Sequence, residues 1–208
     1  PEVVFHLAAQ VSVSVSVREP QKDATQNVVG TINVLEHCRR HGVERVIYAS
    51  SGAAYGEPDS LPLKEEGSTL AVSPYGISKY VGERYLYYYQ QQYGIAFFAL
   101  RFANVYGPRQ DPHGEAGVVS IFCERLLGGE EAVIYGDGRQ TRDFVYVGDV
   151  ARACVMAMDA PPVTGVFPAF NVSTQKQTTV NSLFDLIAKF SQSSQSRIHG
   201  PDRPGDVR

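Results

Sequence analysis

The sequence predicts an α/β fold built on a doubly wound parallel sheet. Short, nearly continuous apolar runs at 3–9, 43–49 and 95–102 are typical of strands that are covered on both faces. Segments with helical periodicity at 23–41 and 75–93 separate these runs. Strand and helix therefore alternate along the chain, which favours parallel strands joined by right-handed helical crossovers.

Both predicted helices end at a glycine. Gly42 follows the 23–41 segment and Gly94 follows the 75–93 segment, and glycine is the residue favoured just past a helix C-terminus. The stretch 12–17 is less clear, because its serines and valines alternate with the period of a strand. The same valines could belong to a loop packed against a ligand, and we expect a loop there.

The pattern changes after Pro108, where the elements become shorter. Residues 110–117 are polar and rich in glycine, which is typical of a surface loop. Beyond them the periodicity predicts a smaller α/β part. The expected helices are 118–127, 149–158 (capped by Asp149) and 179–190, the expected strands are 132–135, 144–147 and 166–172, and 136–138 and 191–196 are expected to be a turn and a loop.

Composition and charge exclude several classes of function. A formal net charge of −3 over 208 residues indicates neither nucleic-acid binding nor a membrane-surface role, and no apolar run is long enough to span a bilayer. The 3 cysteines are far apart and form no C-x-x-C pair, so we expect reduced thiols and a cytoplasmic location. His37 and His41 have the spacing of a metal pair, but they lack an H-E-x-x-H pattern. We interpret them as cations that complement a helix C-terminus, and no metal site is predicted.

Tyr75 and Lys79 are the candidate centre of the chemistry. Ser73 and Pro74 suit the N-cap and first turn of a helix, and the four-residue spacing then puts both side chains on one face near the positive end of the helix dipole. A nearby ammonium and the dipole both favour a phenolate, so we expect a lowered pKa for Tyr75 and a role as general base. The pair alone favours an ordinary surface helix, and the rest of the chain has to decide between the two.

Polar residues follow each of the first strands at its carboxyl end, where open α/β sheets bind ligands. These clusters are Ala8–Gln10, Ser50–Ser51 and Asn104. Ser51 could then hydrogen-bond the oxygen that Tyr75 deprotonates. A Ser/Tyr/Lys trio around an alcohol suits hydride chemistry, in which the base takes the hydroxyl proton and a nicotinamide takes the hydride.

Seven stretches together carry a family resemblance. They read HLAA (6–9), NVVGT (27–31), SSGAAYG (50–56), SPYGISK (73–79), LRFANVYGPRQ (100–110), YGDGRQTRDFVYVGDVA (135–151) and RPGD (203–206). The chain resembles the extended short-chain dehydrogenase/reductase family, in its group of NAD-dependent nucleotide-sugar epimerases and dehydratases, and is most similar to UDP-glucose 4-epimerases. The resemblance implies a Rossmann-like sheet over 1–107, a nucleotide-sugar-binding region over 108–208, and a return of 136–160 to the first domain.

The resemblance also implies roles for individual residues. Tyr75 would be the base, Lys79 would bind the nicotinamide ribose, and Ser51 would hold the sugar 4-oxygen. Residues that would face NAD are Ala8, Ala9, Gln10, Asn27, Ser50 and Phe102, together with Tyr75 and Lys79. Residues that would bind the UDP-sugar, in addition to Ser51, are Asn104, Val118, Tyr135, Arg142, Arg203 and Asp206. A homodimer through the helices 23–41 and 75–93 is implied as well.

The sequence departs from the family pattern at its start, because no G-x-x-G-x-x-G phosphate loop is present. We therefore expect the first strands of the fold to precede residue 1 and the end of the sugar-binding part to follow residue 208. The 208-residue stretch by itself is expected to bind NAD poorly and to be inactive.

The residues after Ser51 indicate which reaction is carried out. By resemblance, 4,6-dehydratases and decarboxylases of the family have carboxylates here, whereas this chain reads Gly52-Ala53-Ala54. The expected reaction is therefore epimerisation at C4 of a UDP-hexose through a transient 4-keto sugar. A nucleotide-sugar dehydratase, decarboxylase or reductase of the same family and a non-catalytic nucleotide-sugar binder remain alternatives.

Overall fold

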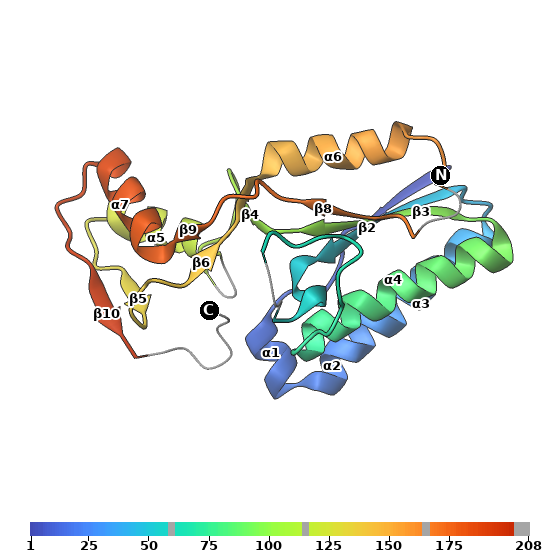
Figure 1. The fold of residues 1–208 in the computed structure, drawn as a ribbon, viewed down its shortest axis with the longest axis horizontal. Helices are drawn as coiled ribbons and strands as arrows, with labels where there is room; N and C mark the ends of the chain where they lie inside the picture. The colour runs from blue at the N-terminus through green and yellow to red at the C-terminus, as the bar shows by residue number, and fades with distance from the viewer. Residues whose placement is uncertain (58–60, 114–116, 164–166, 202–208) are drawn as a thin grey trace. The chain divides into compact units, whose positions relative to one another are not determined.

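A parallel sheet forms the first half of the molecule. The computed structural model describes residues 1–57, 61–113, 117–163 and 167–201. Its main sheet has the strand order β1–β2–β3–β8, with every neighbouring pair parallel (Figure 1). The strands are β1 (Val3–His6), β2 (Arg45–Ser51), β3 (Ala96–Phe102) and β8 (Ala169–Val172).

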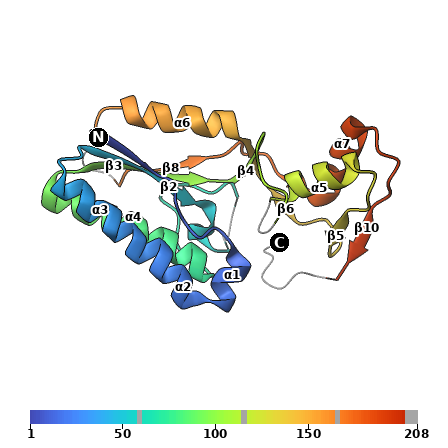
Figure 2. The ribbon, with the colours of Figure 1, turned by 180° about the vertical axis from the view of Figure 1, so that it is seen from behind.

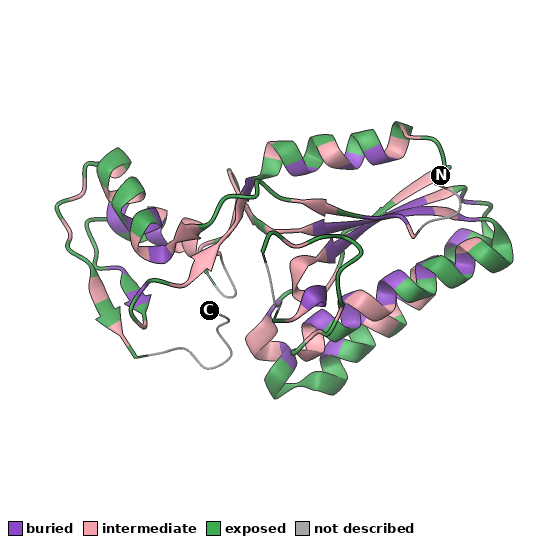
Figure 3. Ribbon diagram, viewed as in Figure 1, coloured by how far each residue is buried: buried purple, intermediate pink, exposed green. Residues whose placement is uncertain are grey.

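Helices cover both faces of this sheet, as the views from opposite sides show (Figures 1 and 2). Helices α3 (Gly30–Arg40) and α4 (Pro74–Tyr93) lie on one face, and α6 (Val147–Asp159) lies on the other. Alternate strand residues therefore enter two cores, for example Phe97 beside α3 and α4 and Phe98 beside α6. The central strands are buried through most of their length (Figure 3). The predicted doubly wound α/β fold is confirmed.

The expected loop at 12–17 is wrong, because helix α1 (Val13–Arg18) occupies it. Ser12 is its N-cap and accepts a hydrogen bond from the Val15 amide at 2.9 Å. The Ser16 hydroxyl bonds the Val13 carbonyl at 2.7 Å, so the serines satisfy backbone groups within the turn. The alternation of serine and valine in the sequence does not reveal that Ser12 caps a helix.

The predicted 23–41 helix consists of several segments. Helix α2 (Pro20–Ala24) leads into a π-helical turn, η1 (Thr25–Val29), which continues into α3. Gly42 (φ 65°) and Gly94 (φ 73°) adopt the left-handed conformation after α3 and α4, so both predicted helix ends are confirmed. Nowhere in the described ranges is a helix both long and apolar enough to traverse a bilayer.

The second half of the chain forms small paired strands beside a pair of helices. Strands β4 (Asn104–Tyr106) and β7 (Phe144–Tyr146) pair, as do β5 (Val133–Tyr135) with β10 (Ile198–Gly200) and β6 (Thr141–Arg142) with β9 (Thr178–Thr179). Helices α5 (Val118–Leu127) and α7 (Val180–Ser191) share a core that includes Phe122 and Phe184. Asp149 lies in the first turn of α6. Our expectation that Asp149 would be the cap of this helix is therefore wrong.

The chain divides into two compact units. One contains Pro1–Phe102 and Asp149–Val172, and the other contains Ala103–Gly148 and Ser173–Arg208. From the sequence we expected the first domain to end at residue 107 and the stretch 136–160 to return to it. The assignment of these units to NAD binding and nucleotide-sugar binding stays a prediction.

Candidate functional site

Tyr75 and Lys79 lie on the first two turns of α4, as predicted. The Ser73 hydroxyl accepts a hydrogen bond from the Gly76 amide at 3.1 Å, and Pro74 is the first helical residue. Since the two side chains are four residues apart, they project from the same helix face. The start of the helix therefore orients the pair.

A glycine one turn further along lets α4 approach the sheet closely. A Cβ atom at Gly82 would overlap the hydroxyl of Tyr48 and lie 2.8 Å from its Cζ. Tyr48 belongs to β2 and is 1% exposed, so it has little room to move. The absence of a side chain at Gly82 thus sets the distance between α4 and β2.

The Lys79 side chain is buried, with 3% of its surface exposed. Its Nζ atom donates a hydrogen bond to the Ala49 carbonyl at 2.7 Å and lies 5.0 Å from the centroid of the Tyr48 ring. Burial lowers the pKa of Lys79 to about 8, while the negative charge of Asp23 opposes that change. The ammonium has further N–H donors that, among the described residues, are not used.

The pKa of Tyr75 moves in the direction opposite to our prediction. Burial raises it above its ordinary value, a hydrogen bond with Ser51 acts against this change, and the charge of Asp23 adds to it. The expected lowering neglected the cost of placing a phenolate in a poorly solvated site. It also assumed an ammonium beside the phenol, whereas Lys79 bonds Ala49.

The last two residues of β2 point their hydroxyls at different partners. Ser51 caps the short helix η2 (Gly52–Tyr55) by accepting from the Ala53 amide at 3.1 Å, and its hydroxyl lies close enough to Tyr75 to affect the pKa of that phenol. The Ser50 hydroxyl is buried and donates to Glu83 at 2.5 Å. Phe102, at the end of β3, is the register partner of Ser51. The sheet thus brings Ser51, Tyr75 and Lys79 together at its carboxyl edge, as the sequence predicted.

The loop after β1 is held at the same edge by an amide pair. Gln10 and Asn27 exchange two hydrogen bonds: the Gln10 amide donates to Asn27 Oδ1 at 2.8 Å, and Asn27 Nδ2 donates to the Gln10 carbonyl at 2.9 Å. Asn27 also reaches Ser78 on α4 at 3.1 Å. Ala8 and Ala9 precede this anchor, exposed and half-buried respectively. Asn27 lies in the π-helical turn, a feature often found at functional sites.

His6, at the end of β1, is 6% exposed and hydrogen-bonds the Thr31 hydroxyl at 2.9 Å. Burial and the charge of Lys79 lower its pKa to about 4. The imidazole is therefore neutral near pH 7, and its role is structural.

Apart from Ser51, the residues expected to contact the UDP-sugar lie in the second unit. Asn104 is exposed on β4, where its backbone amide donates to the Asp143 carbonyl at 2.9 Å. Val118 begins α5, Tyr135 ends β5 and is 46% exposed, and Arg142 on β6 donates to the Thr141 carbonyl at 2.8 Å. Arg203 and Asp206 lie outside the described residues. Their grouping around a ligand stays a prediction.

A family model described as "NAD dependent epimerase/dehydratase family" matches residues 1–173. The chain belongs to this family. It is 46% identical, over 100% of its own length and 66% of the relative's, to a UDP-glucose 4-epimerase of Mycolicibacterium smegmatis. A crystal structure of the Thermotoga maritima UDP-glucose 4-epimerase with UDP-glucose matches with a TM-score of 0.96 and 48% identity, over 100% of this chain and 67% of that one. The Thermus thermophilus UDP-glucose 4-epimerase in complex with NAD matches with a TM-score of 0.92 and 43% identity, over the same shares.

Three buried charged residues of this family member were missed by our reading of its sequence. Asp23 is 1% exposed, and among the described residues its Oδ2 atom has no hydrogen-bond partner. Glu83 and Arg101 form a buried ion pair near the candidate site. Arg101 stands inside the apolar run 95–102, and a charge in a buried strand is the signal that could have found the pair.

Proposed function

We propose that the full-length protein epimerises C4 of a UDP-hexose, interconverting UDP-glucose and UDP-galactose with NAD as cofactor. The observation that carries this proposal is the convergence of Ser51, Tyr75 and Lys79 at the carboxyl edge of the sheet. The chain spans about 66% of the length of a UDP-glucose 4-epimerase to which it is 46% identical, and this similarity supports the choice of reaction.

The donors at this edge fit a nicotinamide ribose. Lys79 uses one N–H on Ala49, and its remaining donors suit ribose hydroxyls. The loop Ala8–Gln10 is anchored through Asn27, so its backbone can line the same ligand. When bound, NAD supplies the acceptor and donor of a hydride at the sugar carbon.

Tyr75 and Ser51 handle the proton on the sugar 4-oxygen. Because the Ser51 and Tyr75 hydroxyls lie close enough to interact, an alcohol placed beside them can contact both. Ser51 orients the oxygen, and Tyr75 accepts its proton and later returns it. A ligand that draws the Lys79 ammonium away from Ala49 and towards the phenol would lower the cost of the phenolate.

The segment after Ser51 restricts the reaction to C4. Gly52, Ala53 and Ala54 carry no acid or base, and Ala54 is fully buried. Dehydration requires removal of a C5 proton, and this segment contains no carboxylate that could remove it. Within the proposed enzyme Tyr75 is the acid/base at the sugar, and the 4-keto sugar turns in the site before it is reduced.

The second unit supplies the proposed contacts to the nucleotide. Asn104 and the guanidinium groups of Arg142 and Arg203 bind the diphosphate, for which arginine offers paired donors. Asp206 accepts from the ribose, and Val118 and Tyr135 flank the base. These roles rest on the family motifs in which the residues stand.

The proposal is tested by incubating the full-length protein with UDP-galactose and NAD and measuring UDP-glucose by chromatography. Formation of UDP-glucose with no net consumption of NAD is the expected result. Accumulation of a 4-keto-6-deoxy sugar would instead identify a dehydratase. Binding of UDP-galactose without any product would identify a non-catalytic binder.

The proposal includes a homodimer formed through α3 and α4 and a cytoplasmic location. Tyr85, Tyr88 and Tyr93 on α4 are exposed by 36%, 48% and 46%, and tyrosine is favoured at interfaces. Arg39 on α3 lies 5.3 Å from the Tyr93 ring centroid, which joins the two helices into one surface. All 3 cysteines are free thiols, in keeping with a reducing compartment.

A further inference from the structure

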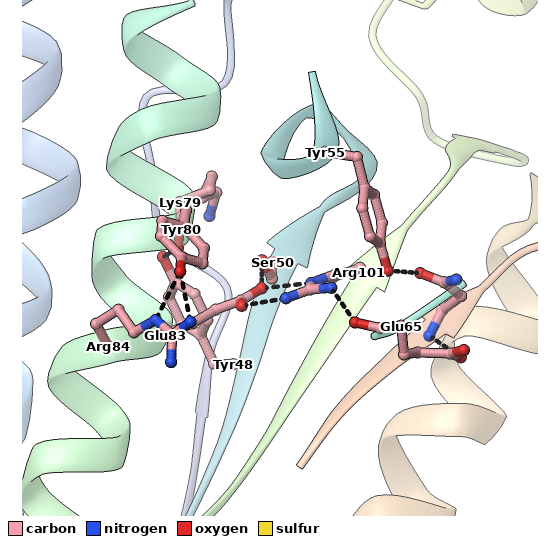
Figure 4. A network of polar contacts seen from close by, with 10 residues as sticks. Tyr48, Ser50, Tyr55, Glu65, Lys79, Tyr80, Glu83, Arg84 and Arg101 are labelled. Carbon is pink, nitrogen blue, oxygen red and sulfur yellow. Dashed lines mark hydrogen bonds and ion pairs between the residues drawn. The ribbon is translucent and has the colours of Figure 1, made fainter. Parts of the chain in front are cut away.

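A buried ion pair joins α4 to β3 just behind the candidate catalytic residues (Figure 4). Glu83 is 0% and Arg101 is 3% exposed. Arg101 Nη2 donates to Glu83 Oε2 at 2.7 Å, and Arg101 Nε donates to Glu83 Oε1 at 2.9 Å, so the pair is bidentate. Glu83 follows Lys79 by four residues and therefore lies one helical turn further along α4.

The same carboxylate also holds β2. The Ser50 hydroxyl donates to Glu83 Oε1 at 2.5 Å, and Ser50 directly precedes Ser51 in the strand. Glu83 thus contacts the strand that carries Ser51 from the helix that carries Tyr75. The separation of these two catalytic hydroxyls depends on how α4 and the end of β2 are held together.

The guanidinium extends this connection to the segment after β2. Arg101 Nη1 donates to the Glu65 carbonyl at 3.2 Å, and the guanidinium lies 4.7 Å from the centroid of the Tyr55 ring. Tyr55 ends the η2 turn that Ser51 caps, and its hydroxyl donates to Asn171 at 2.7 Å. Glu83 therefore contacts the residue before Ser51, and Arg101 contacts Tyr55, four residues after it (Figure 4).

Stability alone does not explain such a pair. Desolvating two charges costs free energy, and apolar residues of similar volume often replace a buried ion pair without loss of stability. A bidentate pair does fix the relative position of the elements that it joins. The pair lies between the elements that carry Ser51 and Tyr75, so its role can be to fix the relative position of these two side chains for catalysis.

We propose that Glu83 and Arg101 are positioning residues, which through Ser50 and Tyr55 hold Ser51 within hydrogen-bonding reach of Tyr75. This inference rests on the proposed reaction for its kinetic readout. Neither residue touches the substrate. Displacing a catalytic group by about 1 Å can reduce a rate by about 100-fold, so their removal should lower kcat and leave KM nearly unchanged.

Two double variants separate positioning from stability. Glu83→Leu with Arg101→Met removes both charges and the acceptor for Ser50. Glu83→Gln with Arg101→Met also removes both charges but keeps a carbonyl oxygen for Ser50. Both should fold with thermal midpoints close to each other, because neither leaves a buried charge unpaired. The leucine variant should lose about 10- to 100-fold in kcat, and the glutamine variant should recover most of that loss.

Ser50→Ala gives a third comparison, because it cuts the link to β2 and keeps the ion pair. It should lower kcat in the wild-type background and have little further effect in the leucine variant. Single-turnover formation of reduced nicotinamide is recorded alongside kcat, since hydride transfer at C4 is common to epimerases and dehydratases. Crystal structures of both double variants report the separation of the Ser51 and Tyr75 hydroxyls without any assay.

A larger separation in the leucine variant, and the wild-type separation in the glutamine variant, are the expected results. The positioning role is overturned if both double variants keep wild-type kcat, or if both structures keep the wild-type separation. A wild-type protein that transfers hydride but yields no epimer refutes the proposed reaction and leaves the single-turnover comparison valid. If the wild-type protein shows no turnover at all, the crystal structures decide.

Discussion

Replacing Lys79 by methionine should abolish activity and stabilise the folded protein at neutral pH. Burial lowers the Lys79 pKa from 10.5 to about 8, and at about 1.4 kcal/mol per pH unit this costs the folded state about 3 kcal/mol. Methionine occupies a similar volume without a charge. Methionine cannot form the hydrogen bond to the Ala49 carbonyl, and this loss costs about 1 kcal/mol. The free energy of unfolding should therefore increase by about 2 kcal/mol in total.

The gain should depend on pH in a defined window. Below about pH 8 both the folded and the unfolded wild-type chains keep the Lys79 proton, and the cost of burial is fully present. Between about 8 and 10.5 the folded chain has lost a proton that the unfolded chain still holds, so wild-type stability rises with pH relative to the variant. Above 10.5 the cost of burying the charge vanishes.

Denaturant unfolding of both proteins, followed by circular dichroism at about pH 7 and about pH 10, measures this difference. Lys64→Met, at an exposed position in the same unit, is the matched control and should change stability at neither pH. A Lys79→Met protein that is less stable than wild type at about pH 7 would refute the reasoning. An advantage of equal size at both pH values would refute it as well.

Three further changes test the site and the assembly. Tyr75→Phe should lower kcat by about 100- to 10,000-fold with the fold intact, and because burial raises the Tyr75 pKa, wild-type kcat should rise from neutral to alkaline pH while the residual rate of the variant stays flat. Gly82→Ala should destabilise the protein, since overpacking against Tyr48 costs about 1–3 kcal/mol and exceeds the gain in helix propensity of about 1 kcal/mol. The control is Gln91→Ala, at an exposed position of α4. Equal melting temperatures of the two variants would contradict this expectation. Tyr88→Glu should shift sedimentation from dimer to monomer, and an unchanged profile would count against the proposed interface.

The strands and long helices could be predicted because their signals are local. Apolar runs marked β2 and β3, and Ser73 and Gly94 marked the two ends of α4. Helix α1 was missed because its serines satisfy backbone groups, which the alternation of residue types does not reveal. The very short strands β6 and β9 were missed because two residues have no periodicity.

The sequence alone placed Ser51, Tyr75 and Lys79 at one edge of the sheet, because strand order and helix spacing determine where such residues emerge. Their electrostatics were decided by tertiary structure. The pKa of Tyr75 rises and that of Lys79 falls because burial removes water, and the spacing of the two residues does not reveal how deeply their side chains are buried. The Glu83–Arg101 pair likewise needed the fold, since it joins residues that lie close only when α4 packs on β3.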